Sequence, residues 1–298
     1  MTTLRSIFFI SIFLLLVSCT RSGIDARTPL PQPTATMLPP TQVQTTPHPP
    51  TISPPTETPK TQQDLSTLGT WDVVVIGDSS LWGVGDAIAA HIEDDLGISV
   101  NVHDFVISNL TAKQALEAVS TSKPDTPNAR MQGWPEIIAD AEFIILHPSP
   151  AESISVQNPG DWSCMYPPYY VENCTLETFE QYQADLRAII REIITLRQDK
   201  STIIRFGSYW GRPGNWLETD GDAVCMECLE TDAKAVEAVA SEFGFPFATA
   251  LDVLNGQNHD QEPDALGFIG EDGVHTSQSG AQEIADQIWD LGIAPIQP

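Results

Sequence analysis

The sequence predicts an α/β domain built on a parallel, doubly wound sheet. Short β-branched runs alternate with stretches in which apolar residues recur every three or four positions, which is the pattern of strands alternating with helices. The strand runs are almost continuously apolar, as expected for strands that are buried on both faces. After about residue 67 no second linker interrupts the alternation, so we expect one domain. In such sheets the chemistry gathers at the carboxyl ends of the strands.

The strands are predicted from their apolar, β-branched runs. Each run is too short for a helix and carries few polar residues, which favours strands in the middle of a sheet. Four strands are expected at residues 73–76, 98–102, 143–146 and 202–206, with a weaker fifth strand at 246–248.

The helices are predicted from amphipathic spacing. The clearest case runs from Phe179 to Ile194, where apolar side chains recur at steps of three and four residues. The same pattern places helices at residues 86–96, 176–197, 230–243 and 280–291.

Residues 1–19 are predicted to be a lipoprotein signal peptide. Arg5 gives a basic start, and residues 7–17 form an uncharged apolar core that is too short to span a bilayer. The core ends in Leu-Val-Ser before Cys19, which resembles a bacterial lipobox in which Cys19 is lipidated. An ordinary signal peptide with a chance cysteine is the alternative. Acyl chains on Cys19 would hold the protein on the extracytoplasmic face of a bacterial membrane.

Residues 20–66 are predicted to be a disordered stalk. Proline and threonine dominate this stretch, and it has no apolar periodicity. Proline-rich chain favours the extended polyproline II conformation, so the stalk would lift the domain at residues 67–298 off the membrane.

The charge balance excludes several classes of function. The chain has 14 basic and 40 acidic residues, a net charge of −26. Nucleic-acid binding needs a basic face that displaces counterions from phosphates, so no nucleic-acid partner is expected. Electrostatic docking on an anionic lipid surface is disfavoured for the same reason. The acidic excess is most simply explained by solubility.

Two motifs lie where catalytic groups of a parallel sheet are expected. Gly77-Asp78-Ser79 follows the first predicted strand, and the glycine allows a tight turn that would present Ser79 at the strand end. Asp272 and His275 are three residues apart just before the last predicted helix, so one turn places them side by side. A carboxylate that orients an imidazole, which in turn faces a serine hydroxyl, is the arrangement that acyl transfer requires.

These two motifs resemble those of the GDSL/SGNH hydrolase family, and the resemblance covers residues 71–292. It implies Ser79 as the nucleophile, His275 as the general base and then acid, and Asp272 as the residue that orients the imidazole. It also implies a flavodoxin-like, three-layer α/β/α sandwich and an ester hydrolase that needs no cofactor.

The sequence departs from the family at the oxyanion hole, which normally adds a glycine N–H and an asparagine side chain to the N–H of the nucleophile, here Ser79. After the second strand no glycine is present, and we expect Ser108 or Asn109 to donate instead, since asparagine tolerates unusual backbone conformations. After the third strand the asparagine is missing, and Ser149 or His147 is the candidate replacement.

The cysteines predict disulfides. An even number remains after Cys19, and outside the cytoplasm this suggests two bonds. We favour Cys164–Cys174 and Cys225–Cys228 because each pair is local. A four-cysteine zinc site is the rival, but only Cys225 and Cys228 have ligand spacing, so no metal is expected. A redox pair is disfavoured because we place these two cysteines in a loop after the fourth strand.

Aromatic residues in the loops after the third and fourth strands would either frame the triad or pack these loops; Tyr209 and Trp210 are among them. The remaining histidines, including His259, are expected to be structural or solvated. The sequence thus predicts a monomeric, lipid-anchored extracytoplasmic esterase that acts on a small-molecule or polysaccharide ester. The alternative is a weak or inactive relative that binds surface glycans.

Overall fold

The computed structural model describes residues 69–125, 128–150, 175–198, 200–210 and 221–295, without the side chains of residues 221–225. All of them belong to one compact unit, Thr58–Pro298. The predicted signal peptide at 1–19 and stalk at 20–66 lie outside the described residues.

In the part of the chain that the structure describes, the sheet has four parallel strands in the order β2-β1-β3-β4. All four lie where the apolar runs predict them: β1 (Thr70–Gly77), β2 (Ser99–Val106), β3 (Phe143–His147) and β4 (Ile203–Phe206). The strand order and the parallel pairing confirm the predicted flavodoxin-like α/β fold.

The predicted fifth strand is wrong. Residues 246–248 lie in an irregular segment between two helices rather than in the sheet. Pro246 has no N–H to donate to a neighbouring strand. The N–H of Phe245 is already bonded to Ala240 O at 2.9 Å, and Phe247 packs against the helical layer instead.

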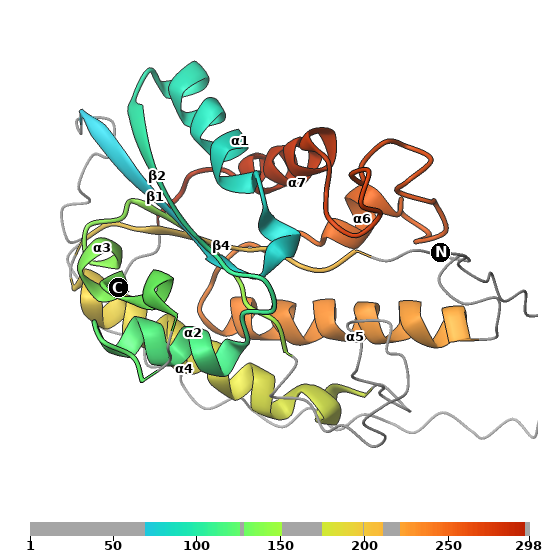
Figure 1. The fold of residues 1–298 in the computed structure, drawn as a ribbon, viewed down its shortest axis with the longest axis horizontal. Helices are drawn as coiled ribbons and strands as arrows, with labels where there is room; N and C mark the ends of the chain where they lie inside the picture. Colours follow the sequence, from blue (N-terminus) through green and yellow to red (C-terminus); the bar gives the residue numbers. More distant parts are fainter. Residues whose placement is uncertain (1–68, 126–127, 151–174, 199, 211–220, 296–298) are drawn as a thin grey trace, which may run out of the picture. The chain divides into compact units, whose positions relative to one another are not determined.

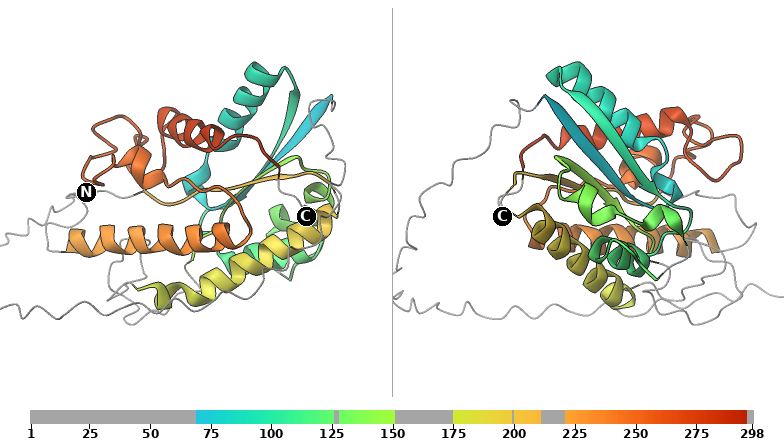
Figure 2. Two further views of the ribbon diagram at one scale, coloured as in Figure 1. Left: turned by 180° about the vertical axis from the view of Figure 1, so that it is seen from behind. Right: turned by 60° about the vertical axis from the view of Figure 1, so that its left-hand side comes forward.

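Helices cover both faces of the sheet (Figures 1 and 2). On one face lie α1 (Val84–His91), α6 (Ala250–Leu254) and α7 (Gln278–Asp290). On the other lie α2 (Ala112–Ser120), α3 (Trp134–Ile138), α4 (Glu180–Arg197) and α5 (Gly221–Glu242).

The two helical layers pack on alternate residues of each strand. In β1, Val73 and Val75 join the core with α1, α6 and α7, whereas Val74 and Ile76 join the core with the other four helices. Successive strand side chains point to opposite faces, so a run of apolar residues fills two cores at once.

Among the described residues, three helices have no counterpart in the sequence prediction: α2, α3 and α6. Each is short, between five and nine residues, so apolar periodicity over so few turns is a weak signal. The N-terminus of α2 nevertheless carries a sequence signal, because Thr111 and Gln114 form a reciprocal capping box. Helix α5 begins at Gly221, so Cys225 and Cys228 lie in a helix and not in the predicted loop.

Two glycines let the strand ends come together at the carboxyl edge of the sheet. A Cβ on Gly77 would lie 2.7 Å from the carbonyl oxygen of His147 and 2.7 Å from a methyl carbon of Leu81. A Cβ on Gly207 would lie 2.9 Å from Leu81 and 3.1 Å from the Cβ of His147. Real Cβ atoms essentially never approach within 3.0 Å of another heavy atom, so a side chain at Gly77 would push the ends of β1 and β3 apart, and one at Gly207 would displace Leu81 or His147.

We therefore expect Gly77→Ala to lower the free energy of unfolding by about 1–3 kcal/mol, the usual cost of overpacking a tight site. Urea unfolding followed by circular dichroism measures this change. Gly69→Ala is the control, because nothing lies within 4 Å of the Cβ it would add. Equal stability of the two variants would contradict the steric argument.

Candidate active site

Three candidate segments meet at the carboxyl edge of the sheet. Ser79 follows β1, the turn with Ser108 and Asn109 follows β2, and Ser149 follows β3. Backbone hydrogen bonds join them, from Ile107 N to Gly77 O at 3.0 Å and from Ser149 N to Leu110 O at 2.7 Å. The fold therefore brings the predicted nucleophile and the predicted oxyanion residues to one edge.

Asp78 fixes the turn that carries Ser79. Its side chain is fully buried, and its Oδ1 accepts a hydrogen bond from Ser80 N at 2.9 Å, which caps the 3₁₀ turn Ser79–Leu81. Its Oδ2 accepts a hydrogen bond from the hydroxyl of Tyr209 at 2.5 Å. Ser79 itself is 6% exposed. Tyr209 is thus a support of the turn, so it does not face substrate as an aromatic wall would.

His147 also braces this turn, and it is not the exposed oxyanion donor that the sequence allowed. Its Nδ1 lies 3.1 Å from Ser80 Oγ, and its ring packs edge-on against Tyr209 at 4.3 Å. Burial lowers the pKa of His147 to about 4, against the opposing charge of Asp78, so the ring is neutral at physiological pH. Nothing in the sequence pairs His147 with Ser80.

Asp272 and His275 form the predicted pair in the loop before α7. Asp272 Oδ2 lies 2.6 Å from His275 Nδ1, and Asp272 Oδ1 accepts hydrogen bonds from the N–H groups of Val274 and His275 at 2.9 and 3.0 Å. The hydrogen bond from His275, aided by the two backbone donors, holds the pKa of Asp272 far below its usual range. The carboxylate is therefore ionised and keeps the imidazole in one orientation.

Trp82 joins the Asp272–His275 pair to the Ser79 turn. Its ring centroid lies 4.2 Å from that of His275, with the planes 31° apart. The hydroxyl of Thr276 donates to the carbonyl of Trp82 at 3.5 Å. Within the described part of the chain no hydrogen bond joins Ser79 to His275. Catalytic hydrogen bonds are often long in structures without substrate.

The predicted oxyanion residues are placed in two different ways. Asn109 adopts a left-handed backbone conformation, φ 57°, and both Ser108 and Asn109 are exposed, so their N–H groups are at the surface of the edge. Ser149 is 1% exposed, and its backbone N–H is engaged by Leu110 O. If Ser149 acts as a donor, it must use its hydroxyl.

Asp232 on α5 is a buried carboxyl that no sequence pattern singles out. It is fully buried, and neither of its oxygens has a hydrogen-bond partner among the residues that the structure describes. Burial, assisted by the charge of Asp78, raises the pKa of Asp232 to about 8. Tyr182 lies within electrostatic range of both carboxyls and donates its hydroxyl to Pro148 O at 2.9 Å.

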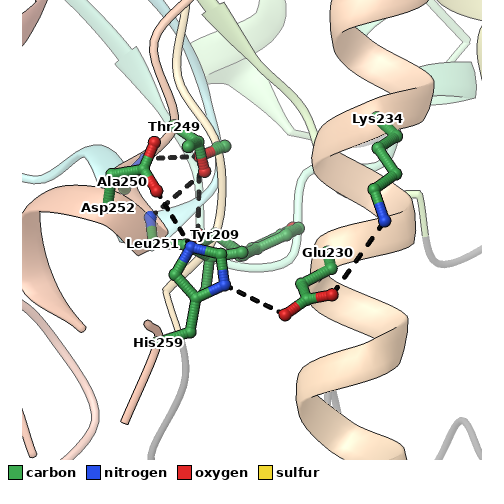
Figure 3. A network of polar contacts seen from close by, with 9 residues as sticks. Tyr209, Glu230, Lys234, Thr249, Ala250, Leu251, Asp252 and His259 are labelled. Carbon is green, nitrogen blue, oxygen red and sulfur yellow. Dashed lines mark hydrogen bonds and ion pairs between the residues drawn. The ribbon is translucent and has the colours of Figure 1, made fainter. Parts of the chain in front are cut away.

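Figure 3 shows a histidine–carboxylate network. Its residues Glu230 and His259 line a cavity of about 330 Å³. His259 bonds Asp252 on α6 through Nε2 at 2.9 Å and Glu230 on α5 through Nδ1 at 3.0 Å. Burial lowers the pKa of His259, but these two carboxylates outweigh it and raise the pKa above 6.5. The network ties the loop after α6 to α5, which is the structural role expected for His259.

The cysteines are only partly described. Cys228 is disulfide-bonded, whereas Cys164, Cys174 and the side chain of Cys225 lie outside the described residues, so both pairings stay predictions. Among the residues described, no group of three or more metal-binding side chains gathers at one point. In the same ranges no helix is both long enough and apolar enough to cross a membrane.

Comparison with known proteins shows the fold. No known family profile matches the chain. The lipase Lip_vut3 from a goat rumen metagenome is similar, with a TM-score of 0.51 and 15% identity over 75% of this chain and 98% of that one. A lipase/acylhydrolase from Enterococcus faecalis scores 0.45 at 16% identity, covering 73% and 93% of the two chains, and adds no weight. At this identity the likeness to the lipase shows a shared fold, the one predicted from the two motifs.

A second comparison carries no functional information. Enolase from Haloarcula marismortui is 29% identical over 87 residues, which is 29% of this chain and 20% of the enolase. The chain thus matches only a fifth of that relative's length, and so short a stretch does not establish a family.

Asp232 generates a prediction about pH. The folded state keeps this proton up to about pH 8, whereas the unfolded chain releases it near the ordinary value of 3.8, so the wild type loses stability as pH rises between these values. Asp232→Asn removes the titration. We expect its stability advantage to grow from near zero at about pH 4 to at least about 2 kcal/mol at about pH 8.

Urea unfolding at several pH values measures this difference. The exposed Asp94 provides the control, because Asp94→Asn changes a solvated carboxyl on the surface of the same domain. A stability difference for Asp232→Asn that is the same at pH 4 and pH 8 would show that Asp232 is not buried as an acid.

Proposed function

We propose that this chain, which has the fold of the SGNH hydrolases, is a serine esterase. The observation that carries the proposal is the Asp272–His275 pair, bonded at 2.6 Å and held by Trp82 against the turn that presents Ser79. The three residues are the nucleophile, base and orienting carboxylate of an acyl-transfer site.

In the proposed reaction Ser79 Oγ attacks the ester carbonyl while His275 Nε2 accepts the hydroxyl proton. The tetrahedral intermediate collapses to an acyl-enzyme, and His275 gives the proton to the departing alcohol. Water, activated by the same imidazole, then hydrolyses the acyl-enzyme and restores Ser79. Asp272 remains ionised throughout, and its charge stabilises the imidazolium that forms in each half of the cycle.

The developing oxyanion needs donors that are fixed before the reaction begins. We assign this task to the N–H of Ser79, to the N–H of Ser108 or Asn109, and to the hydroxyl of Ser149. The bonds that tie the Ser149 backbone to Leu110 and Ala112 support it, because they hold Ser149 beside the turn after β2.

The proposed substrate is a carboxylic ester on an acetylated glycan or an acyl lipid, met outside the cytoplasm. This part rests on the sequence of the signal peptide, Cys19 and the stalk. The replaced oxyanion residues favour one alternative, a weak or inactive SGNH relative that binds glycans at the cell surface. An acyl-enzyme test separates the two.

Ser79→Ala is expected to abolish turnover of a short-chain aryl ester at an unchanged melting temperature. Wild-type protein should form a single adduct with a fluorophosphonate, seen by intact mass, and Ser79→Ala and His275→Ala should lose it. The neighbouring Ser80→Ala is the matched control, because Ser80 bonds His147 and not the triad, so it should keep the adduct. Turnover retained in Ser79→Ala would rule out this nucleophile.

Ser149→Ala is expected to lower kcat by about 10²-fold, the usual cost of one oxyanion donor. The melting temperature should stay within a few degrees of wild type, because the backbone bonds of Ser149 do not depend on its hydroxyl. Steady-state kinetics with the same aryl ester measure the change. An unchanged kcat would remove Ser149 from the oxyanion hole.

A further inference from the structure

Trp82 contacts both halves of the proposed triad. It follows the 3₁₀ turn Ser79–Leu81 directly, and its backbone N–H donates to the carbonyl of Ser79 at 3.3 Å. Its own carbonyl accepts the hydroxyl of Thr276, the residue after His275. Its indole packs on the imidazole of His275 at a centroid distance of 4.2 Å. Trp82 therefore links the turn that carries Ser79 to the loop that carries His275, through both its backbone and its side chain.

The side chain is placed where packing of the core does not require it. Trp82 is 40% exposed, whereas Leu81 beside it is 1% exposed and fills the core. The indole nevertheless contacts the imidazole of His275. The side chain of His275 is itself only 25% exposed, although Asp272 on its other side is 53% exposed.

The position of Trp82 allows it to restrict the orientation of the His275 imidazole. Asp272 fixes the orientation of His275 through Nδ1 at one edge of the ring, and a hydrogen bond at one edge restrains the tilt of the ring plane less than a contact on its face does. A flat indole with its plane 31° from that of the imidazole restricts this tilt. The negative face of an indole also attracts an imidazolium, the form of His275 that exists only after proton transfer. Trp82 can thus act before and during the chemical step.

We propose that Trp82 is a positioning residue, which holds the His275 imidazole in line with Ser79. The proposal rests on the proposed esterase function and adds a residue to it. Trp82 touches the base and not the reacting bond, so its contribution appears in kcat and not in substrate binding.

Trp82→Ala is expected to lower kcat about tenfold with KM within about twofold, because a misplaced base slows the chemical step. Trp82→Phe keeps an aromatic face and should retain kcat within about threefold. Asp272 is the charged group that faces the same ring, and it is unchanged in both variants.

The chain offers a matched control in a second histidine–tryptophan pair. Trp289 on α7 stacks on His91 of α1 at 5.4 Å with the planes 10° apart, away from the proposed triad. Trp289→Ala removes an indole from a histidine in the same way, so it should lower the melting temperature and leave kcat unchanged.

The outcomes separate the two proposals. A raised KM with an unchanged kcat in Trp82→Ala would make Trp82 a wall of the substrate site and overturn the positioning role. Equal loss of kcat in Trp82→Ala and Trp289→Ala would show that the loss arises from reduced stability of the fold, which would overturn the positioning role. If wild type forms an adduct with a fluorophosphonate and Trp82→Ala reacts at the same rate, only the Trp82 proposal fails. If wild type forms no adduct, the esterase assignment fails as well.

The contact itself has an independent readout. The indole should shift the ring protons of His275 upfield in a ¹H–¹³C NMR spectrum of the wild type, with His275→Gln giving the assignment. This shift should disappear in Trp82→Ala and persist in Trp82→Phe. An His275 signal that is the same in wild type and Trp82→Ala would show that the two rings do not pack together in solution.

Discussion

The approach of Gly77 to the carbonyl of His147 is the constraint on which the site depends. It allows Asp78 N to bond His147 O at 3.2 Å, so the turn after β1 is fixed to the end of β3. From this point Asp78 reaches Ser80 and Tyr209, and the 3₁₀ turn presents Ser79 and Trp82. A larger residue at position 77 would displace all of these groups together, because they follow one another along a single rigid turn.

The sequence predicted the parts of the site that are local. The four strands and the Asp272–His275 pair depend on residues that are close in the sequence. Apolar runs therefore predict the strands, and a spacing of three residues predicts the pair. The contacts of Asp78 with Tyr209 and of His147 with Ser80 span more than sixty residues, and no spacing encodes them. Asp232 is not predicted for the same reason. An acidic residue on a helix is expected to face solvent unless the packing of the neighbouring helices and sheet is known.

Two buried acids close to the nucleophile give the site an unusual electrostatic background. Asp78 has hydrogen bonds from Tyr209 and Ser80, whereas Asp232 relies on keeping its proton. A neutral Asp232 spares the region a second buried negative charge, which would be costly without a partner.

The proposed triad draws its members from opposite ends of the domain. Ser79 follows the first strand, whereas Asp272 and His275 precede the last helix. The loop with the acid–base pair can form early, because its bonds are short-range, but the nucleophile meets it only when α1 has packed on α7 through residues such as Val84 and Ile284. Closing so long a chain segment is slow compared with local folding. A newly made chain would therefore carry no hydrolytic activity until its final helix has docked.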